Sequence, residues 1–230
     1  MIKKGIPQEW LKIIACVSML IDHGAYVFGW ALQWRAVGRL AFPIYCFLLA
    51  EGSFYTRNPH KYMLRLAIGA VISEFAFDFG FYGRCQWLHQ NVMLTLLLGV
   101  MALEVIKGCR NVPAKIFAAL LFALIAELLN TDYGLYGVLL IVLFGITREM
   151  PRKWPVLAAG MTVLFLWMPS AVRMIFGIPV PVQIFGLFAL IPIALYSGEK
   201  LTKSKAAKWV FYLFYPVHMV LLRLLWLVLR

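Results

Sequence analysis

Two histidines stand within apolar stretches of the chain, each beside a second polar group. His23 follows Asp22 in an apolar run that begins at Leu11, and His218 follows Tyr215 by three residues in the last apolar run. A charge at the centre of a membrane-spanning helix costs about 2.5–3.5 kcal/mol, so such groups face a bundle interior and mark functional paths. A neutral imidazole accepts a proton near neutral pH, as a general base must. These four side chains are therefore the candidate catalytic groups.

The two histidines are expected at one depth, near the midplane, because their predicted helices run in the same direction. Adjacent helical residues point about 100° apart, so Asp22 cannot simply hold the ring of His23. Asp22 either pairs with an arginine or lysine or caps a neighbouring helix. Pro216 removes a backbone hydrogen bond inside the last helix. The resulting kink either aims Tyr215 and His218 into a cavity or is simply tolerated.

A pair of carboxylates lies in the third apolar run. Glu74 and Asp78 are four residues apart, so they stack on one face of a helix. Two bare carboxylates would repel there, and Arg39, Arg173 and Arg223 are predicted in the same, outer half of the bundle. We expect an arginine–carboxylate network, which serves either as structural support or as part of a binding site.

The composition requires lipid as the solvent of these elements. Of the 230 residues, 63% are hydrophobic and 14% are charged, and the mean hydropathy is +0.84. Soluble domains are nearer half apolar and a quarter charged. We predict an all-α, polytopic transmembrane helix bundle with residues 1–230 forming one domain. The net charge of +12 comes from short basic clusters between apolar runs, which is typical of topology signals rather than of nucleic-acid binding.

Nine runs are candidate membrane spans, since a span needs about 20 mostly apolar residues. They lie near 11–32, 37–55, 62–82, 90–107, 115–129, 133–147, 155–176, 182–196 and 208–229. With a cytoplasmic N-terminus, 16 of the 22 basic residues fall on the inner side, as the positive-inside rule requires. These are Lys3, Lys4, Lys12, Arg57, Lys61, Arg65, Lys107, Arg110, Lys115, Arg148, Arg152, Lys153, Lys200, Lys203, Lys205 and Lys208.

Neither metal nor nucleotide motifs are present in the sequence. The four cysteines are scattered and form no metal-ligand spacing, so no metal site is predicted. Walker, GxSxG, HExxH and Rossmann patterns are also missing.

A set of short segments, spread nearly end to end, carries a family resemblance. They are 11–15 (LKIIA), 19–23 (MLIDH), 38–43 (GRLAFP), 47–52 (FLLAEG), Tyr62 with Arg65 and Leu66, Ser73 with Glu74, Phe77 with Asp78, Asn91, 132–134 (DYG), 196–198 (YSG) and 211–218 (FYLFYPVH). Together they resemble the TraX family of F-pilin acetyltransferase-like integral membrane acyltransferases. One position departs from the family pattern, because Ser197 stands where asparagine is expected.

The resemblance implies an acetyltransferase that uses acetyl-CoA and lies as a multi-pass protein in the bacterial cytoplasmic (inner) membrane. Related proteins include heparan-alpha-glucosaminide N-acetyltransferase and polysaccharide O-acetylases, in which a membrane-embedded histidine is the suspected catalyst. The matching position in this chain is His23. The implied partners are acetyl-CoA, an acceptor protein such as a pilin or an acceptor glycan, and membrane lipid, but no nucleic acid.

The implied mechanism begins with cytosolic acetyl-CoA, whose phosphates are attracted by Arg57, Lys61 and Arg65 unless these are topology signals only. His23 then deprotonates the acceptor amine or hydroxyl, or accepts the acetyl group itself. His218 or Tyr215 stabilises the oxyanion. The candidate substrate-binding residues are Arg39, Glu51, Glu74, Asp78, Asn91, Asp132 and Tyr133.

Two other functions are compatible with the sequence. Intramembrane acids and histidines also form proton relays in transporters and channels. However, the internal repeats and paired broken helices that are frequent in transporters are missing from this sequence. A non-catalytic assembly factor for a pilus or secretion apparatus would need no histidine at this depth.

Overall fold

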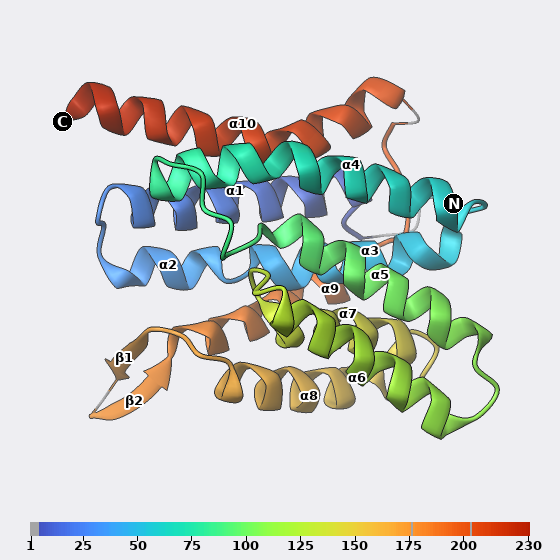
Figure 1. Ribbon diagram of the computed structural model, residues 1–230. Coiled ribbons are helices and arrows are strands. Elements are labelled where there is room, and N and C mark those ends of the chain that lie inside the picture. Colours follow the sequence, from blue (N-terminus) through green and yellow to red (C-terminus); the bar gives the residue numbers. More distant parts are fainter. Residues whose placement is uncertain (1–4, 176, 203) are drawn as a thin grey trace. The chain divides into compact units, whose positions relative to one another are not determined.

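The computed structural model describes residues 5–175, 177–202 and 204–230, with the side chains of 205–208 left out. Lys3, Lys4 and Lys203, which contribute to the predicted charge bias, lie outside the described residues. The chain divides into two compact units, residues 1–45 with 161–230 and residues 46–160. Helices dominate both (Figure 1), which confirms the predicted helical class.

The first unit is built around helix α1 (Gln8–Val27), which packs against α2 (Leu32–Gly38) and α10 (Lys205–Leu229). Gly29, with φ of +65°, turns the chain between α1 and α2. Glycine adopts this left-handed conformation at little cost. The 3-10 helix η2 (Val182–Ala189) packs against α2 and leads into α9 (Leu190–Ala194). The same unit contains the first residues of α3 (Ala41–Tyr55) and the last residues of α8 (Lys153–Trp167).

A break separates α2 from α3 at Arg39 and Leu40. The sequence predicted a span starting near 37, but α2 already begins at Leu32. Pro43 lies in the first turn of α3, so it cannot donate to the carbonyl of Arg39 four residues earlier. The proline therefore interrupts a helical segment.

An antiparallel hairpin interrupts the otherwise helical first unit. Strand β1 (Val172–Ile175) pairs with β2 (Ile178–Pro181), with Val172 opposite Pro181 and Ile175 opposite Ile178. The hairpin lies at the same end of the unit as the α1–α2 turn (Figure 1). The hairpin is the exception to the predicted all-α class. The helix predicted at 155–176 is shorter than expected, because α8 ends at Trp167 before Pro169.

The second unit consists mainly of antiparallel helices. They are α4 (Pro59–Phe77), the π-helix η1 (Asp78–Tyr82), α5 (Val92–Gly108), α6 (Val112–Leu128) and α7 (Gly134–Thr147). Helix α5 packs against α4, α6 and α7. Glycines permit this packing, since a Cβ at Gly99 would lie 2.3 Å from Ile141 and one at Gly145 would lie 2.3 Å from Leu103. Small residues allow membrane helices to approach closely in this way.

Helical segments occur at all nine predicted positions, although only some are long enough to span. Gln8–Val27, Leu32–Tyr55 and Trp209–Leu229 have the length and apolar composition of membrane spans. Gly134–Thr147, Lys153–Trp167 and Val182–Ala194 are shorter apolar helices. The count of nine spans and the cytoplasmic N-terminus stay predictions.

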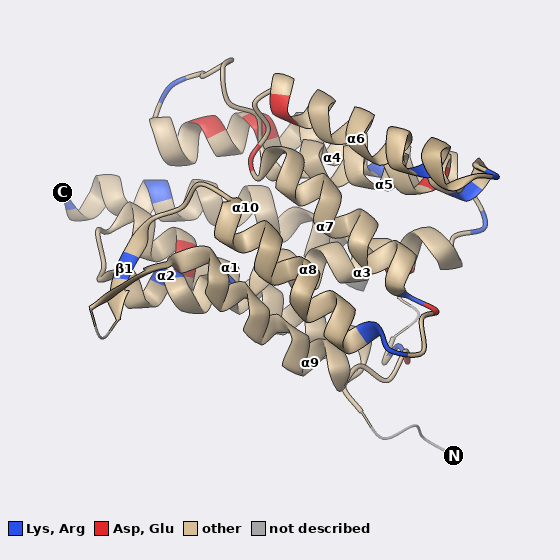
Figure 2. Cartoon of the chain, turned by 90° about the horizontal axis from the view of Figure 1, so that it is seen from below, with Lys and Arg blue, Asp and Glu red and all other residues tan. Residues whose placement is uncertain are grey.

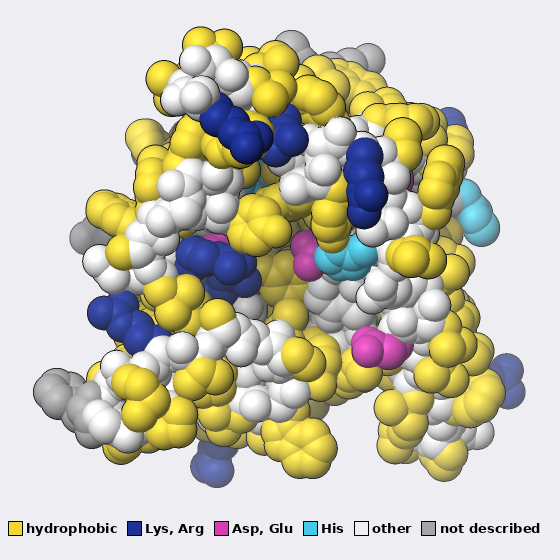
Figure 3. Space-filling view, turned by 60° about the vertical axis from the view of Figure 1, so that its left-hand side comes forward, with side chains coloured by type: hydrophobic (Ala, Val, Ile, Leu, Met, Phe, Trp, Pro, Cys, Tyr) yellow, Lys and Arg dark blue, Asp and Glu magenta, His cyan; other side chains and the backbone are white. Residues whose placement is uncertain are grey.

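The surface is apolar where a soluble protein would be polar. Trp10, Ile13, Val17 and Leu20 form an exposed stripe along α1 at helical spacing, whereas Asp22 on the same helix is buried. Hydrophobic side chains cover most of the face in Figure 3, with a few charged groups between them. Exposed apolar stripes with buried polar groups suit a chain that is surrounded by lipid.

Charged residues are distributed unevenly between the two ends of the helices in the second unit. The loops at 55–59, 108–112 and 147–153 join successive antiparallel helices and so lie at one end. Nine of the ten basic residues of 46–160 lie in or near these loops, and Arg84 is the tenth. In Figure 2, Lys and Arg positions lie where α5 leads into α6, and Asp and Glu positions lie at the far end of α4. By the positive-inside rule, we predict that the basic end is cytoplasmic.

Two native cysteines test this orientation. Cys85 is exposed in the loop before α5, at the acidic end, and Cys109 is partly exposed in the loop after α5, at the basic end. A membrane-impermeant maleimide added to spheroplasts is expected to label Cys85, and to label Cys109 only after the membrane is opened. Cys85→Ser and Cys109→Ser identify each signal, since Cys16 and Cys46 are buried. Labelling of Cys109 alone in sealed spheroplasts would reverse the orientation.

Candidate active site

Helices α1 and α10 bring His23 and His218 into direct contact. Nδ1 of His23 lies 2.7 Å from Nε2 of His218, and the rings stack with centroids 4.9 Å apart. Nδ1 of His218 lies 2.7 Å from the carbonyl oxygen of Phe214. His218 is buried and His23 is half-buried. The structure thus joins the two histidines that the sequence singled out, across 195 positions of the chain.

The hydrogen-bond partners determine where the protons lie on the two rings. A carbonyl oxygen only accepts, so Nδ1 of His218 carries a proton and donates it to Phe214. Neutral His218 then presents a lone pair at Nε2, which accepts from Nδ1 of His23. His23 is left with its own lone pair on Nε2. The chain of bonds therefore orients His23 as a base.

His23 lies nearer the end of its helix than the sequence predicted. Helix α1 ends at Val27 rather than near residue 32, which places His23 about 6 Å from the helix end at 1.5 Å per residue. The turn at Gly29 accounts for the earlier end. The pair is thus displaced from the middle of α1 towards the α1–α2 turn.

Asp22 is held by two arginines from the segment that follows α1. Nη2 of Arg39 donates to Oδ2 of Asp22, and Nε of Arg35 lies 3.4 Å from Oδ1. Of the two roles expected for Asp22, pairing with an arginine is therefore confirmed. Gly38 makes the approach possible, because a Cβ there would lie 2.2 Å from the Cβ of Asp22.

Gln183, at the start of η2, completes this cluster and was missed by sequence reasoning. Its side chain is fully buried, and its Oε1 accepts from Nη1 of Arg39 at 3.2 Å. Its Nε2 has no hydrogen-bond partner among the described residues. Such a buried, unsatisfied donor costs about 1–3 kcal/mol. The only signal in the sequence is a single amide within an apolar run.

Tyr215 belongs to the histidine cluster. It is buried, and its ring centroid lies 6.4 Å from that of His23 and 5.9 Å from that of His218. Pro216, the next residue, lies inside α10. The structure thus gathers all four candidate catalytic residues in the first unit.

Glu74 and Asp78, in the second unit, have amide partners rather than the arginines that the sequence predicted. Oε2 of Glu74 accepts from the backbone of Asn91 at 3.0 Å and from its side chain. Oδ2 of Asp78 accepts from the backbone of Gln86 at 2.7 Å. The arginine–carboxylate network forms around Asp22 instead, where Gly38 lets Arg39 approach.

The other two predicted arginines belong to the first unit, whereas Glu74 and Asp78 belong to the second. Arg173 is in strand β1. The guanidinium of Arg223 lies 4.4 Å from the ring centroid of Trp226.

Asn91, Asp132 and Tyr133, which were predicted to bind substrate, have structural roles at helix starts. The Asn91 side chain accepts from the backbone of Met93 at 2.9 Å and so caps α5. The backbone of Asp132 donates to the carbonyl of Gln90 at 2.8 Å. Tyr133 precedes α7 with φ of +65°. These residues fix the loops at the acidic end of the second unit.

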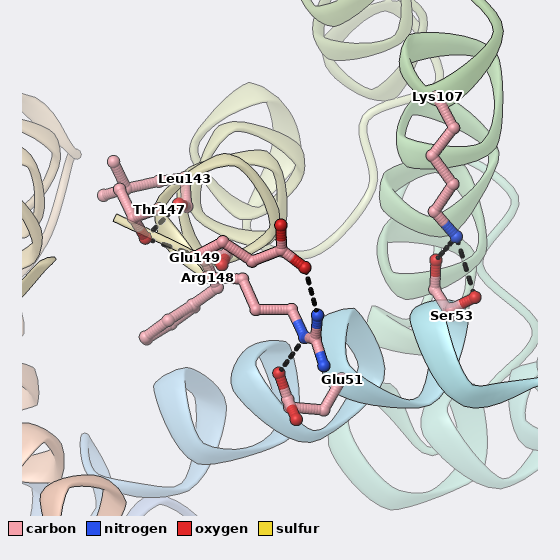
Figure 4. Close-up of polar contacts among 8 residues, drawn as sticks. Glu51, Ser53, Lys107, Leu143, Thr147, Arg148 and Glu149 are labelled. Atoms are coloured by element: carbon pink, nitrogen blue, oxygen red, sulfur yellow. Dashed lines mark hydrogen bonds and ion pairs between the residues drawn. The ribbon is translucent and has the colours of Figure 1, made fainter. Parts of the chain in front are cut away.

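Glu51 belongs to a polar network at the basic end of the second unit (Figure 4). Nε of Arg148 donates to Glu51 at 2.8 Å, and its Nη1 donates to Glu149 at 2.9 Å. Burial disfavours the charge of Arg148, but the carboxylate of Glu51 outweighs this and raises the pKa of Arg148. Beside it, Lys107 donates to Ser53 at 2.7 Å. Glu51 therefore joins α3 to α7.

The three residues predicted to contact phosphates lie at the start of α4. Arg57, Lys61 and Arg65 are exposed. Lys61 and Arg65 are four residues apart and so lie on one side of α4, and Arg57 lies in the bend just before the helix. Asn58 caps the helix by accepting from the backbone of Lys61 at 2.9 Å. The spacing presents three positive charges in a row at the basic end of the second unit.

Comparison with known proteins gives one family. The family described as TraX protein matches residues 7–226. The chain belongs to the TraX family. It is 35% identical over 236 residues to the probable fimbrial assembly protein FimC, serogroup H1, of Dichelobacter nodosus, covering 92% of each chain. It is 28% identical over 141 residues to protein TraX of Escherichia coli, covering 58% of this chain and 53% of that protein. No solved structure matches.

The cluster of this TraX family protein combines a base with fixed positive charge. His23 presents a lone pair, and the guanidinium groups of Arg39 and Arg35 are close enough for their charges to act on it. Asp22 compensates these charges, so the cluster does not repel itself. Such an arrangement can remove a proton from a substrate and stabilise negative charge that forms nearby.

Replacing Asp22 tests the ion pair. Asp22→Asn leaves Arg39, whose side chain is 11% exposed, without a counter-charge. We expect the free energy of unfolding to fall by about 3 kcal/mol or more. Glu149→Gln is the matched control, because the Glu149 side chain is 85% exposed and its pair contributes about 0–1 kcal/mol. Equal losses, measured by thermal unfolding in detergent, would contradict a buried ion pair that holds the site.

Proposed function

We propose that this protein is an acetyl-CoA-dependent acetyltransferase of the bacterial cytoplasmic membrane, which it crosses several times. It transfers the acetyl group to an amine or hydroxyl of an acceptor at or beyond the outer face. The observation that carries the proposal is the hydrogen-bonded chain from the Phe214 carbonyl through His218 to His23. Membership of the TraX family supports it.

His23 is the general base of the proposed reaction. Its Nε2 takes the proton from the acceptor as the acceptor nitrogen or oxygen attacks the thioester carbonyl carbon. The carbon–sulfur bond then breaks, and the thiolate of CoA leaves with the bonding electron pair. The proton passes from His23 to that thiolate, so the base returns to its starting form.

His218 is a positioning residue in this mechanism. Both of its ring nitrogens are engaged, one with Phe214 and one with His23. It therefore has no proton to offer to an oxyanion, in contrast to the role that the sequence suggested. Its contribution is to keep the proton of His23 on Nδ1, as the carboxylate does in a catalytic triad.

The donor phosphates are assigned to Arg57, Lys61 and Arg65. Their exposure at the basic, proposed cytoplasmic end of the second unit supports this assignment. One arginine side chain can contact two phosphate oxygens at once, whereas a lysine contributes a point charge. Arg39 is committed to Asp22 and Gln183, so its proposed role is to shape the site rather than to bind the acceptor alone.

Histidine variants test the proposed base. His23→Ala is expected to abolish acetyl transfer from acetyl-CoA while the protein still folds. His218→Ala is expected to lower kcat by about 10²-fold or more, since the tautomer of His23 is no longer fixed. His60→Ala is the matched control, because His60 is exposed. Retained turnover in His23→Ala excludes this assignment, and failure of the purified protein to turn over acetyl-CoA favours a transporter.

The acceptor is identified by comparing cells with and without the protein. The name of the Dichelobacter relative, a probable fimbrial assembly protein, supports a fimbrial subunit as acceptor. Mass spectrometry is then expected to show an added acetyl group on a surface pilin that is lost in the deletion strain. An acetyl group lost from a surface glycan instead would assign the hydroxyl or amine of a sugar.

A further inference from the structure

The amide of Gln183 is oriented by its neighbour. A guanidinium only donates hydrogen bonds, so the atom that faces Nη1 of Arg39 at 3.2 Å must be the oxygen Oε1. Turning the amide over would place two donors against each other. The amide nitrogen Nε2 therefore points away from Arg39, and the orientation is maintained because Asp22 holds Arg39.

The segment that carries Gln183 is closely packed. Gly186 lies one turn further along η2, and a Cβ there would lie 3.3 Å from the carbonyl oxygen of Arg39 and 2.8 Å from the ring of Phe165. Gln183 is 0% exposed, and its Nε2 is buried without a hydrogen-bond partner among the described residues. Buried donors in folded proteins nearly always have a hydrogen-bond acceptor. A bound ligand would supply an acceptor for Nε2 of Gln183.

The proposed reaction needs a hydrogen-bond donor that stabilises the negative charge on the thioester oxygen. When an acceptor attacks a thioester, the electrons of the carbonyl double bond move to oxygen, and amide donors are among the groups that stabilise such an oxyanion. The Nδ1 proton of His218 is used by the carbonyl of Phe214, and Arg39 donates to Asp22, Gln183 and the carbonyl of Arg35. The amide of Gln183 is neutral, preorganised and joined through Arg39 to the residue next to His23.

We propose that Nε2 of Gln183 donates a hydrogen bond to the carbonyl oxygen of the bound acyl thioester. The bond strengthens as the oxyanion forms, and the oxyanion electrons re-form the carbonyl when the thiolate leaves. Arg39 is positively charged and donates to Oε1 of Gln183. Its charge polarises the amide and makes Nε2 a better donor. This inference rests on the proposed acetyltransferase function, and it makes Gln183 a catalytic residue.

Kinetics of three variants test the donor. Gln183→Glu keeps an oxygen for Arg39 and removes the donor, and Gln183→Met removes both polar atoms at similar volume. Each is expected to lower kcat by about 10²–10³-fold, with little change in KM for acetyl-CoA. Gln183→Glu is expected to keep or raise the melting temperature, because it pairs with Arg39. Gln33→Glu is the matched control, since Gln33 is exposed on α2 in the same unit.

Infrared spectroscopy reports the hydrogen bond without turnover. Acetyl-CoA with a ¹³C-labelled carbonyl is bound to His23→Ala, which blocks the reaction, and its carbonyl stretch is compared with that in the His23→Ala, Gln183→Glu double variant. The stretch is expected at lower frequency when Gln183 is present. An unchanged frequency, or full kcat in both Gln183 variants of an active protein, overturns the inference. If the unmodified protein neither binds nor turns over acetyl-CoA, the proposed function itself fails.

Discussion

The ion pair of Asp22 with Arg39 fixes the geometry of the first unit. It joins α1 to the break between α2 and α3, and Arg39 extends it to Gln183 on η2. Both partners are largely shielded from solvent. Removing either one would leave the other as a buried charge without a counter-charge. His23 follows Asp22 in the chain, so the same pair determines where α1 presents the imidazole to His218 on α10.

Much of the helical framework could be predicted from sequence, because apolar runs and their breaks are local properties. The sequence predicted that His23 and His218 lie at one depth, but their direct contact comes from the packing of α1 against α10. The hairpin of β1 and β2 could not be predicted, because both strands are short and β2 contains Pro179 and Pro181. The end of α1 was misplaced because the left-handed turn at Gly29 has no periodic signal.

The polar partners were harder to predict than the polar residues. The sequence indicated that Asp22, Glu74 and Asp78 need partners, but it did not say which ones. The answer depends on loops. The backbone amides of Asn91 and Gln86 donate to Glu74 on α4 and to Asp78 on η1, and no residue pattern reveals these contacts. Gln183 was overlooked for a related reason, since one amide in an apolar run becomes meaningful only when Arg39 is placed beside it.

The close contact between Gly38 and Asp22 means that substitutions at these two positions depend on each other. A side chain at 38 would occupy the space of the Asp22 Cβ, and a change at 22 would strand the charge of Arg39. Substitutions at 22, 38 and 39 are therefore acceptable only in combination, because single steps pass through an intermediate that is misfolded or carries an unpaired buried charge. Across functional descendants of this chain, the three positions should be inherited as a block, while the lipid-facing stripe of α1 drifts freely among apolar residues.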